Sequence, residues 1–129
     1  MAGIFTRIIN GEIPGHKIAE DDRYFAFLDI NPIQKGHTLV IPKKEIDYIF
    51  DLDDDLLAGM LPFAKKVATK IKKVVPCDRI GITVIGLEVP HAHVHLIPID
   101  GVNDMDASRS RVQLSQEEFA DLAKRIREA

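Results

Sequence analysis

The spacing of apolar residues predicts a helix in the middle of the chain and a second one at its end. Between residues 53 and 75, apolar side chains recur every three or four positions, as they do on one face of a helix. Acidic residues open this segment and lysines close it, which complements the helix dipole. Pro62 falls inside the pattern, where a proline is expected to kink or split the helix. The second helix starts at Ser115, which is spaced to form a capping box with Glu118, and it carries an apolar face made by Phe119, Leu122, Ala123 and Ile126.

Short segments of β-branched or alternating residues predict the strands. They lie at residues 17–20, 24–29, 37–41, 79–85 and 91–99, and residues 4–9 form one short amphipathic helical turn. Residues 100–110 are polar and predict a mobile loop. Strands joined by short connections, together with two separated helices, favour an α+β fold with a largely antiparallel sheet of about five strands.

Composition narrows the class of protein. A chain of 129 residues, 46% of them hydrophobic, predicts a single domain over residues 1–129. A net charge of −3 argues against a long nucleic acid as partner. Cys77 is the one cysteine, which excludes a disulfide within the chain and a cysteine-based structural zinc site. No apolar run reaches the ~18 residues of a membrane span and no signal peptide is evident, so we expect a cytoplasmic protein without membrane contact.

Three of the five histidines stand at alternate positions, His91, His93 and His95. On a strand the side-chain period is two, so the three imidazoles share one face while Ala92 and Val94 point to the other. Three protonated rings so close together would repel one another. We therefore expect neutral rings, each held in one tautomer by a hydrogen-bond partner.

Three interpretations of this row compete. Its imidazoles could ligate a metal ion, a central imidazole could act as a nucleophile, or the rings could be purely structural. A catalytic zinc site needs a carboxylate that orients its histidine ligands. The nearest acid, Glu88, lies an odd number of residues before His91, so on a continuous strand it would point to the opposite face. Pro90 also interrupts the strand. Phosphoryl transfer needs hydrogen-bond donors around the phosphate oxygens, and the backbone N–H groups of a turn containing Gly86 could supply them. The spacing alone favours the nucleophile and leaves the metal site open.

Four segments of the chain, taken in order, resemble the signatures of the histidine triad (HIT) superfamily of nucleotidyl hydrolases and transferases. The segments are residues 4–14, 26–32, 36–44 and the His91-x-His93-x-His95 motif. The resemblance spans residues 4–99 and leaves 100–129 as a C-terminal extension. It implies a HIT-like fold and a branch of the family that hydrolyses purine nucleoside phosphoramidates or related nucleotides, with an activity like that of either a phosphoramidase or a dinucleoside polyphosphate hydrolase. It also implies a homodimer.

The resemblance assigns roles to four histidines. His93 would attack the α-phosphate and form a covalent nucleotidyl-histidine, oriented by a backbone carbonyl near His91. His95 would lie beside the phosphate and the leaving group, and His37 would support the cluster from the neighbouring strand. This chemistry implies no metal and no cofactor. Two alternatives remain, namely a non-catalytic nucleotide-binding protein and a metal-dependent hydrolase that uses the histidine row as ligands.

The resemblance also places a nucleotide. Asp29 and Ile30 match positions that contact the ribose and the base, and a carboxylate can accept hydrogen bonds from both ribose hydroxyls. An apolar base pocket would be formed by Phe5, Ile8 and Phe27, although plain core packing explains these three equally well. The segment before the triad would meet the phosphate through Gly86, Glu88 and Val89.

Two departures from the family pattern stand out. Some relatives bind zinc through Cys-x-x-Cys near the N-terminus, where this chain has Gly3 and Thr6, so that metal is not expected. The usual Asn-x-Gly and Gly-Gln segments are replaced by residues 80–82 and 86–90. This change removes an amide and adds the negative charge of Glu88, which bears on substrate preference and rate.

Overall fold

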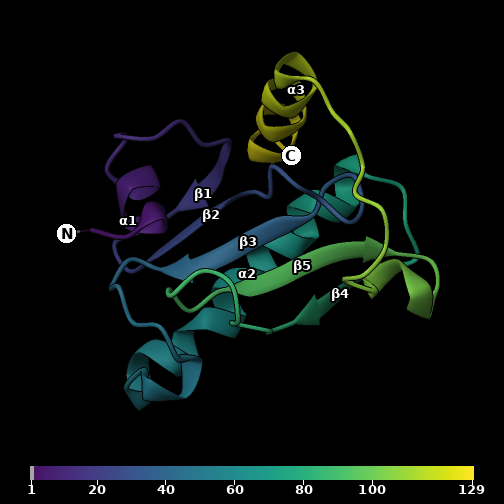
Figure 1. Ribbon diagram of the computed structural model, residues 1–129. Helices are drawn as coiled ribbons and strands as arrows, with labels where there is room; N and C mark the ends of the chain where they lie inside the picture. The colour runs from purple at the N-terminus through teal and green to yellow at the C-terminus, as the bar shows by residue number, and fades with distance from the viewer. Residues whose placement is uncertain (1) are drawn as a thin grey trace.

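A computed structural model describes residues 2–129 (Figure 1). The elements in chain order are α1 (Ile4–Ile9), β1 (Lys17–Glu20), β2 (Tyr24–Leu28), β3 (Thr38–Pro42), the 3-10 helix η1 (Ile49–Asp51), α2 (Asp54–Val74), β4 (Arg79–Thr83), β5 (Val94–Ile99), the 3-10 helix η2 (Val102–Met105) and α3 (Gln116–Arg127). The five strands form one antiparallel sheet in the order β1-β2-β3-β5-β4. The predicted α+β architecture is confirmed.

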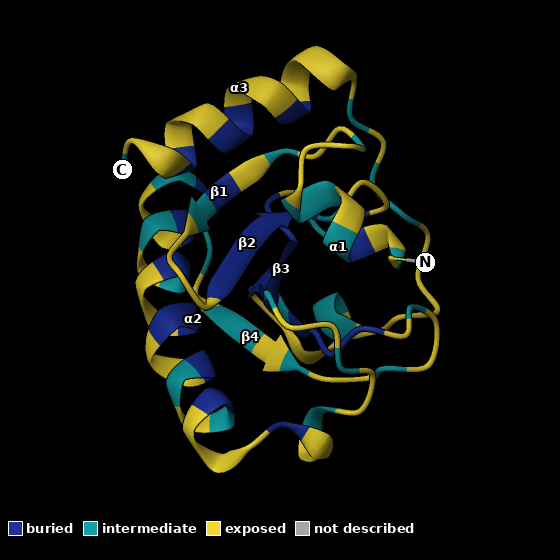
Figure 2. Cartoon of the chain, turned by 90° about the vertical axis from the view of Figure 1, so that its left-hand side faces the viewer, coloured by how far each residue is buried: buried dark blue, intermediate teal, exposed yellow. Residues whose placement is uncertain are grey.

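The main core lies between one face of the sheet and the two long helices. Alternate residues of the central strands, Ala26, Leu28, Val40, Val94 and Leu96, pack against the apolar faces of α2 and α3. The opposite face of the sheet carries a second, smaller cluster beneath α1, and Figure 2 shows α1 and α2 on opposite sides of the sheet. Because side chains alternate along a strand, His95 points to the α1 side.

The predicted long helix is confirmed, but it is not split at Pro62. Helix α2 runs without interruption from Asp54 to Val74, with the side chain of Asp53 accepting a hydrogen bond from the N–H of Leu56 at its start. Pro62 is exposed, so the break in the hydrogen-bond ladder that a proline causes falls on the solvent side of the helix. The capping box of Ser115 and Glu118 is present, as predicted.

The last two predicted strands are shorter than expected. Strand β5 begins at Val94 rather than at residue 91, because the N–H of Ala92 donates to the carbonyl of Ile46 in the loop after β3 (2.7 Å) and so leaves the strand ladder. Strand β4 ends at Thr83 instead of residue 85. The loop predicted over residues 100–110 contains the 3-10 helix η2. Within the described residues, none of the helices has the length and apolar character that a membrane crossing requires.

Candidate functional site

Four histidines meet at one end of the central strands. His95 lies on β5 opposite Leu39 of β3, and His93 comes immediately before β5. His37 directly precedes β3. The ring centroids of His93 and His95 are 4.9 Å apart, and those of His37 and His95 are 5.2 Å apart. The structure places His37 beside His95, although His37 stands 54 positions before His91 in the sequence.

Backbone carbonyls determine the tautomers of the first two histidines of the row. The Nε2–H of His91 donates to the carbonyl oxygen of Pro42 at 2.7 Å. The Nδ1–H of His93 donates to the carbonyl oxygen of His91 at 2.6 Å. Since a carbonyl only accepts, both nitrogens must carry a proton. Nε2 of neutral His93 is thus left with a free lone pair.

A second chain of hydrogen bonds determines the tautomers of His37 and His95. The backbone N–H of Ile33 donates to Nδ1 of His37 at 3.1 Å, so this nitrogen carries no proton and Nε2 of His37 does. That Nε2–H donates to Nδ1 of His95 at 2.9 Å. His95 therefore holds its own proton on Nε2. The site combines a free lone pair on His93 with an N–H donor on the neighbouring ring.

Burial keeps these rings uncharged. It lowers the pKa of His37 to about 4 and that of His95 to about 4, and in His95 the neighbouring His37 adds to the effect. Burial likewise lowers the pKa of His91 below its ordinary value. These shifts agree with the expected neutral state of His91 and His95, and the hydrogen bonds agree with the expectation of fixed tautomers.

The three histidines of the row do not converge as metal ligands. Among residues 2–129, the potential ligand atoms that lie within 4.8 Å of one another belong to Asp29, His37 and His95, and only His95 comes from the row. The bond from Ile33 places the proton of His37 on Nε2, the atom that would have to bind the ion. The geometry thus disfavours the row as a metal centre.

The N-terminal positions that bind zinc in some relatives are engaged differently. The N–H of Gly3 and the hydroxyl of Thr6 both donate to Oε1 of Glu45, at 2.7 and 2.6 Å. These two hydrogen bonds lower the pKa of the Glu45 carboxyl, the one from Thr6 more strongly. Neither position offers a thiolate, so the residues present do not fit such a zinc site.

A cavity of about 240 Å³ opens beside the histidines. It is lined by Asp29, Asn31, Ile33, His37, Ile85, Gly86, Leu87, Glu88, His93, His95, Ala107 and Arg111. One oxygen of the Asp29 carboxylate accepts a hydrogen bond from the N–H of Asn31, and the other lies 3.6 Å from Nε2 of His37. Ile30, the next residue in the chain, is not among the residues that line the cavity, and 70% of its surface is exposed. Gly86 adopts a φ of +74°, which favours glycine at that turn.

The remaining predicted nucleotide residues lie in the second core cluster. Phe5 and Phe27 are buried there, with the partly buried Ile8 and Val89 packed against the cluster. The ring of Phe5 lies 5.3 Å from that of His93 and 5.6 Å from that of His91. None of these four residues lines the cavity, and Phe5 packs directly against the histidines.

Sequence reasoning missed the residues that the C-terminal segment contributes. Ala107 and Arg111 line the cavity although they follow β5 by several residues. They belong to a stretch without apolar periodicity or a recognisable motif, so no local pattern could have placed them there.

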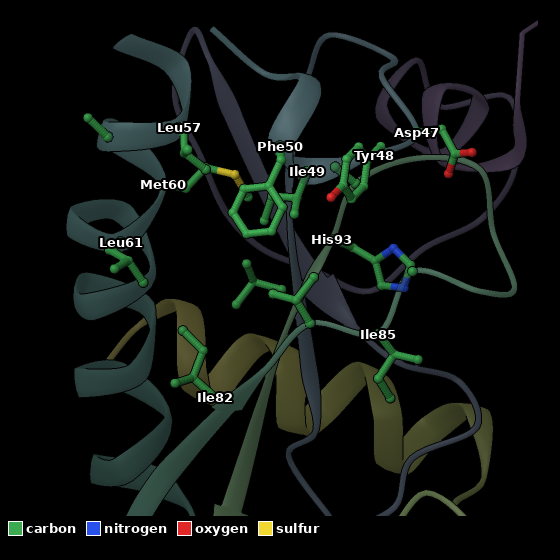
Figure 3. A pocket seen from close by; sticks show the side chains of 15 residues that line it. Asp47, Tyr48, Ile49, Phe50, Leu57, Met60, Leu61, Ile82, Ile85 and His93 are labelled. Carbon is green, nitrogen blue, oxygen red and sulfur yellow. The ribbon is translucent and has the colours of Figure 1, made fainter. Parts of the chain in front are cut away.

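A larger apolar hollow of about 700 Å³ adjoins the other side of His93 (Figure 3). Its walls come from η1, α2, β4 and the residues after β4, among them the labelled Phe50, Leu61, Ile82 and Ile85. His93 lines both this hollow and the histidine cavity.

The fold and site define a class of small α+β domains that present a neutral histidine row at one end of an antiparallel sheet. A family model described as the HIT domain matches residues 10–102, and the chain belongs to this family. It is 37% identical over 131 residues to an uncharacterised HIT-like protein of Borreliella burgdorferi, covering 95% of this chain and 94% of that protein. It is 38% identical over 102 residues to an adenosine 5′-monophosphoramidase of Saccharomyces cerevisiae, covering 75% and 62%. The crystal structure of a HIT-like protein from Bartonella henselae superposes with a TM-score of 0.83 at 34% identity, covering 98% and 94%.

Proposed function

We propose that this protein is a nucleotide-binding hydrolase that cleaves purine nucleoside phosphoramidates or related nucleotides at the α-phosphate through a covalent intermediate on His93. The observation that carries the proposal is the hydrogen bond from Nδ1–H of His93 to the carbonyl of His91. It leaves the lone pair of Nε2 free beside the cavity, as a nucleophile requires. The yeast relative named above as a monophosphoramidase supports the same chemistry.

The tautomers define a balanced two-step reaction. Nε2 of His93 attacks the α-phosphorus and an N–P bond forms. The bond from phosphorus to the leaving amine, which is protonated on nitrogen in the bound substrate, breaks, and the lone pair that develops on the amine accepts a hydrogen bond from Nε2–H of His95. In the second step, the oxygen of a water molecule attacks phosphorus, the bond from phosphorus to Nε2 of His93 breaks, and the water gives its proton to solvent. The carbonyl of His91 stabilises the positive charge that the His93 ring carries in the intermediate.

The turn before the histidines supplies donors for the phosphate in this proposal. Within the described part of the chain, the backbone N–H groups of Gly86, Leu87 and Glu88 donate to no other protein group. Gly86 is the positive-φ glycine that shapes the turn, and Leu87 and Glu88 follow it. Such amides can bind phosphate oxygens in place of the amide side chain missing from this sequence.

The nucleoside would extend from the phosphate toward Asp29. The carboxylate of Asp29 lines the cavity and would accept hydrogen bonds from the ribose hydroxyls, while the exposed side chain of Ile30 would contact the base. Phe5 and Phe27 lie behind the histidines and would shape the base pocket only through packing.

Trapping of the intermediate tests the mechanism. Protein mixed with adenosine 5′-phosphoramidate and quenched in acid-free denaturant should gain the mass of one adenylyl group on the peptide that contains His93. The His93→Gly variant should gain none, and a His16→Gly variant serves as a control because His16 bonds to Gln116 away from the cluster. Binding of AMP without adduct or turnover would favour the non-catalytic alternative. Activity that is lost on chelation and restored by zinc would favour the metal-dependent one.

We also propose that the protein acts as a homodimer joined along β4. This strand is an edge of the sheet, and exposed apolar side chains surround it. They are Tyr48, Phe50, Leu61, Ile82, Val84 and Ile85. An unpaired edge strand beside an apolar hollow is suited to pairing with a second copy of itself.

Sedimentation equilibrium tests the dimer. The wild-type protein should have twice the mass of one chain at micromolar concentration. Ile82→Lys should be monomeric, because a lysine on the edge strand opposes strand pairing. Val102→Lys, a substitution of a highly exposed residue in η2, should remain dimeric. A monomeric wild-type protein would contradict this part of the proposal.

A further inference from the structure

Residues 100–112 form a segment between β5 and α3 that contributes two residues to the wall of the histidine cavity. These residues are Ala107 and Arg111. The Nη2–H of Arg111 donates to the carbonyl of Ala107 at 3.1 Å, so the two wall residues are held together. The position of both therefore depends on how the whole segment is attached to the sheet.

The hydrogen bonds of this segment are internal. The carboxylate of Asp104 accepts the N–H of Gly101 at 3.0 Å and the Nη1–H of Arg109 at 2.9 Å. Within the described part of the chain, no hydrogen bond joins residues 101–110 to a residue outside 100–111. A loop that is bonded in this way to itself moves as one unit unless packing ties it to the domain.

Met105 supplies the apolar contact between this segment and the sheet. It is half-buried, whereas Val102 and Ala107, the other apolar side chains of residues 101–110, are exposed. A methyl group in place of the hydrogen of Gly81 on β4 would overlap the sulfur of Met105 and would lie 3.2 Å from its Cε. The thioether therefore lies directly on the backbone of Gly81, in a space that only glycine leaves open.

The contact between Met105 and Gly81 lies on the face of the sheet that carries His95. Thr83, two residues after Gly81, pairs with His95 of β5, and Gly81 pairs with Ile97. Because residues two apart on a strand share a face, position 81 lies on the side to which His95 points. Met105 thus holds the segment over the face of the sheet beside the cavity.

The far end of the segment lies beside Asp29. The Nη1–H of Arg111 donates to the carbonyl of Asn31 at 3.4 Å. The N–H of Asn31 in turn donates to the carboxylate of Asp29 at 2.8 Å. The wall formed by residues 107–111 therefore borders the part of the cavity into which the proposed function directs the nucleoside.

We propose that Met105 is a positioning residue for nucleotide binding, because its packing on Gly81 holds residues 107–111 in place as a wall of the nucleoside half of the cavity. The inference rests on the proposed function, which directs the nucleoside toward Asp29. Without the thioether, the self-bonded segment is attached to the domain mainly at its two ends, and the wall leaves its place for part of the time. The apparent affinity for a nucleotide then falls in proportion to the fraction of molecules in which the wall is in place.

Calorimetric titration with AMP tests this role. Met105→Ala should weaken the binding of AMP about fivefold, which corresponds to a wall that is in place about one fifth of the time. Gly81→Ala should have a similar effect, because the added methyl group displaces the sulfur. In the double variant the methyl group has no sulfur to displace, so the loss should equal that of Met105→Ala alone. Val102→Ala is the matched control, since Val102 lies in the same 3-10 helix with 90% of its surface exposed, and it should bind AMP as the wild-type protein does.

Steady-state kinetics separate positioning from a general loss of structure. With adenosine 5′-phosphoramidate as substrate, Met105→Ala should raise KM about fivefold and leave kcat within about twofold of the wild-type value. The reason is that the hydrogen bonds that orient the four histidines do not involve residues 100–112. A damaged fold would lower kcat as well.

The contrary outcomes are equally specific. An unchanged affinity for AMP in Met105→Ala, losses that add up in the double variant, a fall in kcat with KM unchanged, or a wild-type protein that does not bind AMP would overturn the assignment. The adduct on His93 is measured separately. An adduct together with unchanged AMP binding in Met105→Ala removes only the role of Met105. AMP binding that depends on the contact of Met105 with Gly81, without any adduct, removes only the hydrolase.

Discussion

The relay from Ile33 through His37 to His95 predicts the consequence of removing one ring. In His37→Ala, the backbone N–H of Ile33 loses its acceptor and Nδ1 of His95 loses its donor. His95 would then no longer be confined to the tautomer that carries its proton on Nε2. Both the stability of the domain and the orientation of the Nε2–H donor of His95 depend on this one side chain.

The size of the effect follows from the two groups left without partners. An unsatisfied buried polar group costs about 1–3 kcal/mol, so the two together cost about 2–6 kcal/mol. The Ile33 group is buried and bears its full cost, whereas His95 is only partly buried and can bind water through the cavity. We therefore expect the free energy of unfolding to fall by about 3 kcal/mol. The pKa of His95 should rise from about 4 toward its ordinary value, because water reaches the ring and His37 no longer opposes its charge.

Two measurements check this prediction. Urea denaturation at pH 7.5 gives the loss of stability, with His16→Ala as the control at a histidine outside the cluster. Long-range ¹⁵N–¹H spectra of the imidazoles give the tautomers. They should show His95 protonated on Nε2 in the wild-type protein and a mixture of tautomers in His37→Ala. The reasoning is refuted if His37→Ala loses less than about 0.5 kcal/mol and His95 keeps its single tautomer.

Three further predictions concern other parts of the chain. The pKa of about 4 for His37 and His95 lies below the value near 6.5 in an unfolded chain, so the free energy of unfolding should fall as the pH decreases from about 6.5 toward 4. Urea denaturation at pH 5 and pH 7 should show a smaller fall in His95→Asn than in the wild-type protein. Glu45→Gln weakens the two hydrogen bonds that tie α1 to the loop after β3, and hydrogen exchange of the α1 amides should become faster. Ser115→Ala removes the cap of α3 and should lower the free energy of unfolding by about 1 kcal/mol, measured with urea. An unchanged value in any of these experiments would contradict the corresponding assignment.

The fold was largely predictable because its periodicities are local. The apolar spacing of residues 53–75 and the capping box at Ser115 depend on neighbours a few positions apart, and both predictions are confirmed. The start of β5 was not predictable in the same way. It depends on the N–H of Ala92 bonding to Ile46, a residue distant in the sequence, and an alternating pattern contains no information about that partner.

The candidate site also has one part that local sequence patterns predict and another that depends on contacts between distant residues. The alternation of residues 91–95 predicted one polar and one core-facing side, and the burial of Ala92, Val94 and Leu96 in the main core agrees. The tautomers depend instead on a carbonyl of Pro42 and an N–H of Ile33, which only the folded chain brings to the rings. Spacing alone could not decide whether the histidines are metal ligands or include a nucleophile, because that depends on which nitrogen of each imidazole ring carries a proton.

The net charge of the chain does not describe the charges that line the cavity. A net charge of −3 argued against long nucleic acids, and it gives no information about the cavity, where two acids and Arg111 stand among neutral rings. An overall negative protein can bind a nucleotide because the phosphate would interact over a few ångströms with N–H groups of the cavity, and distant charges are screened by salt. Recognition would therefore depend on the groups that line the cavity and not on the net charge of the chain.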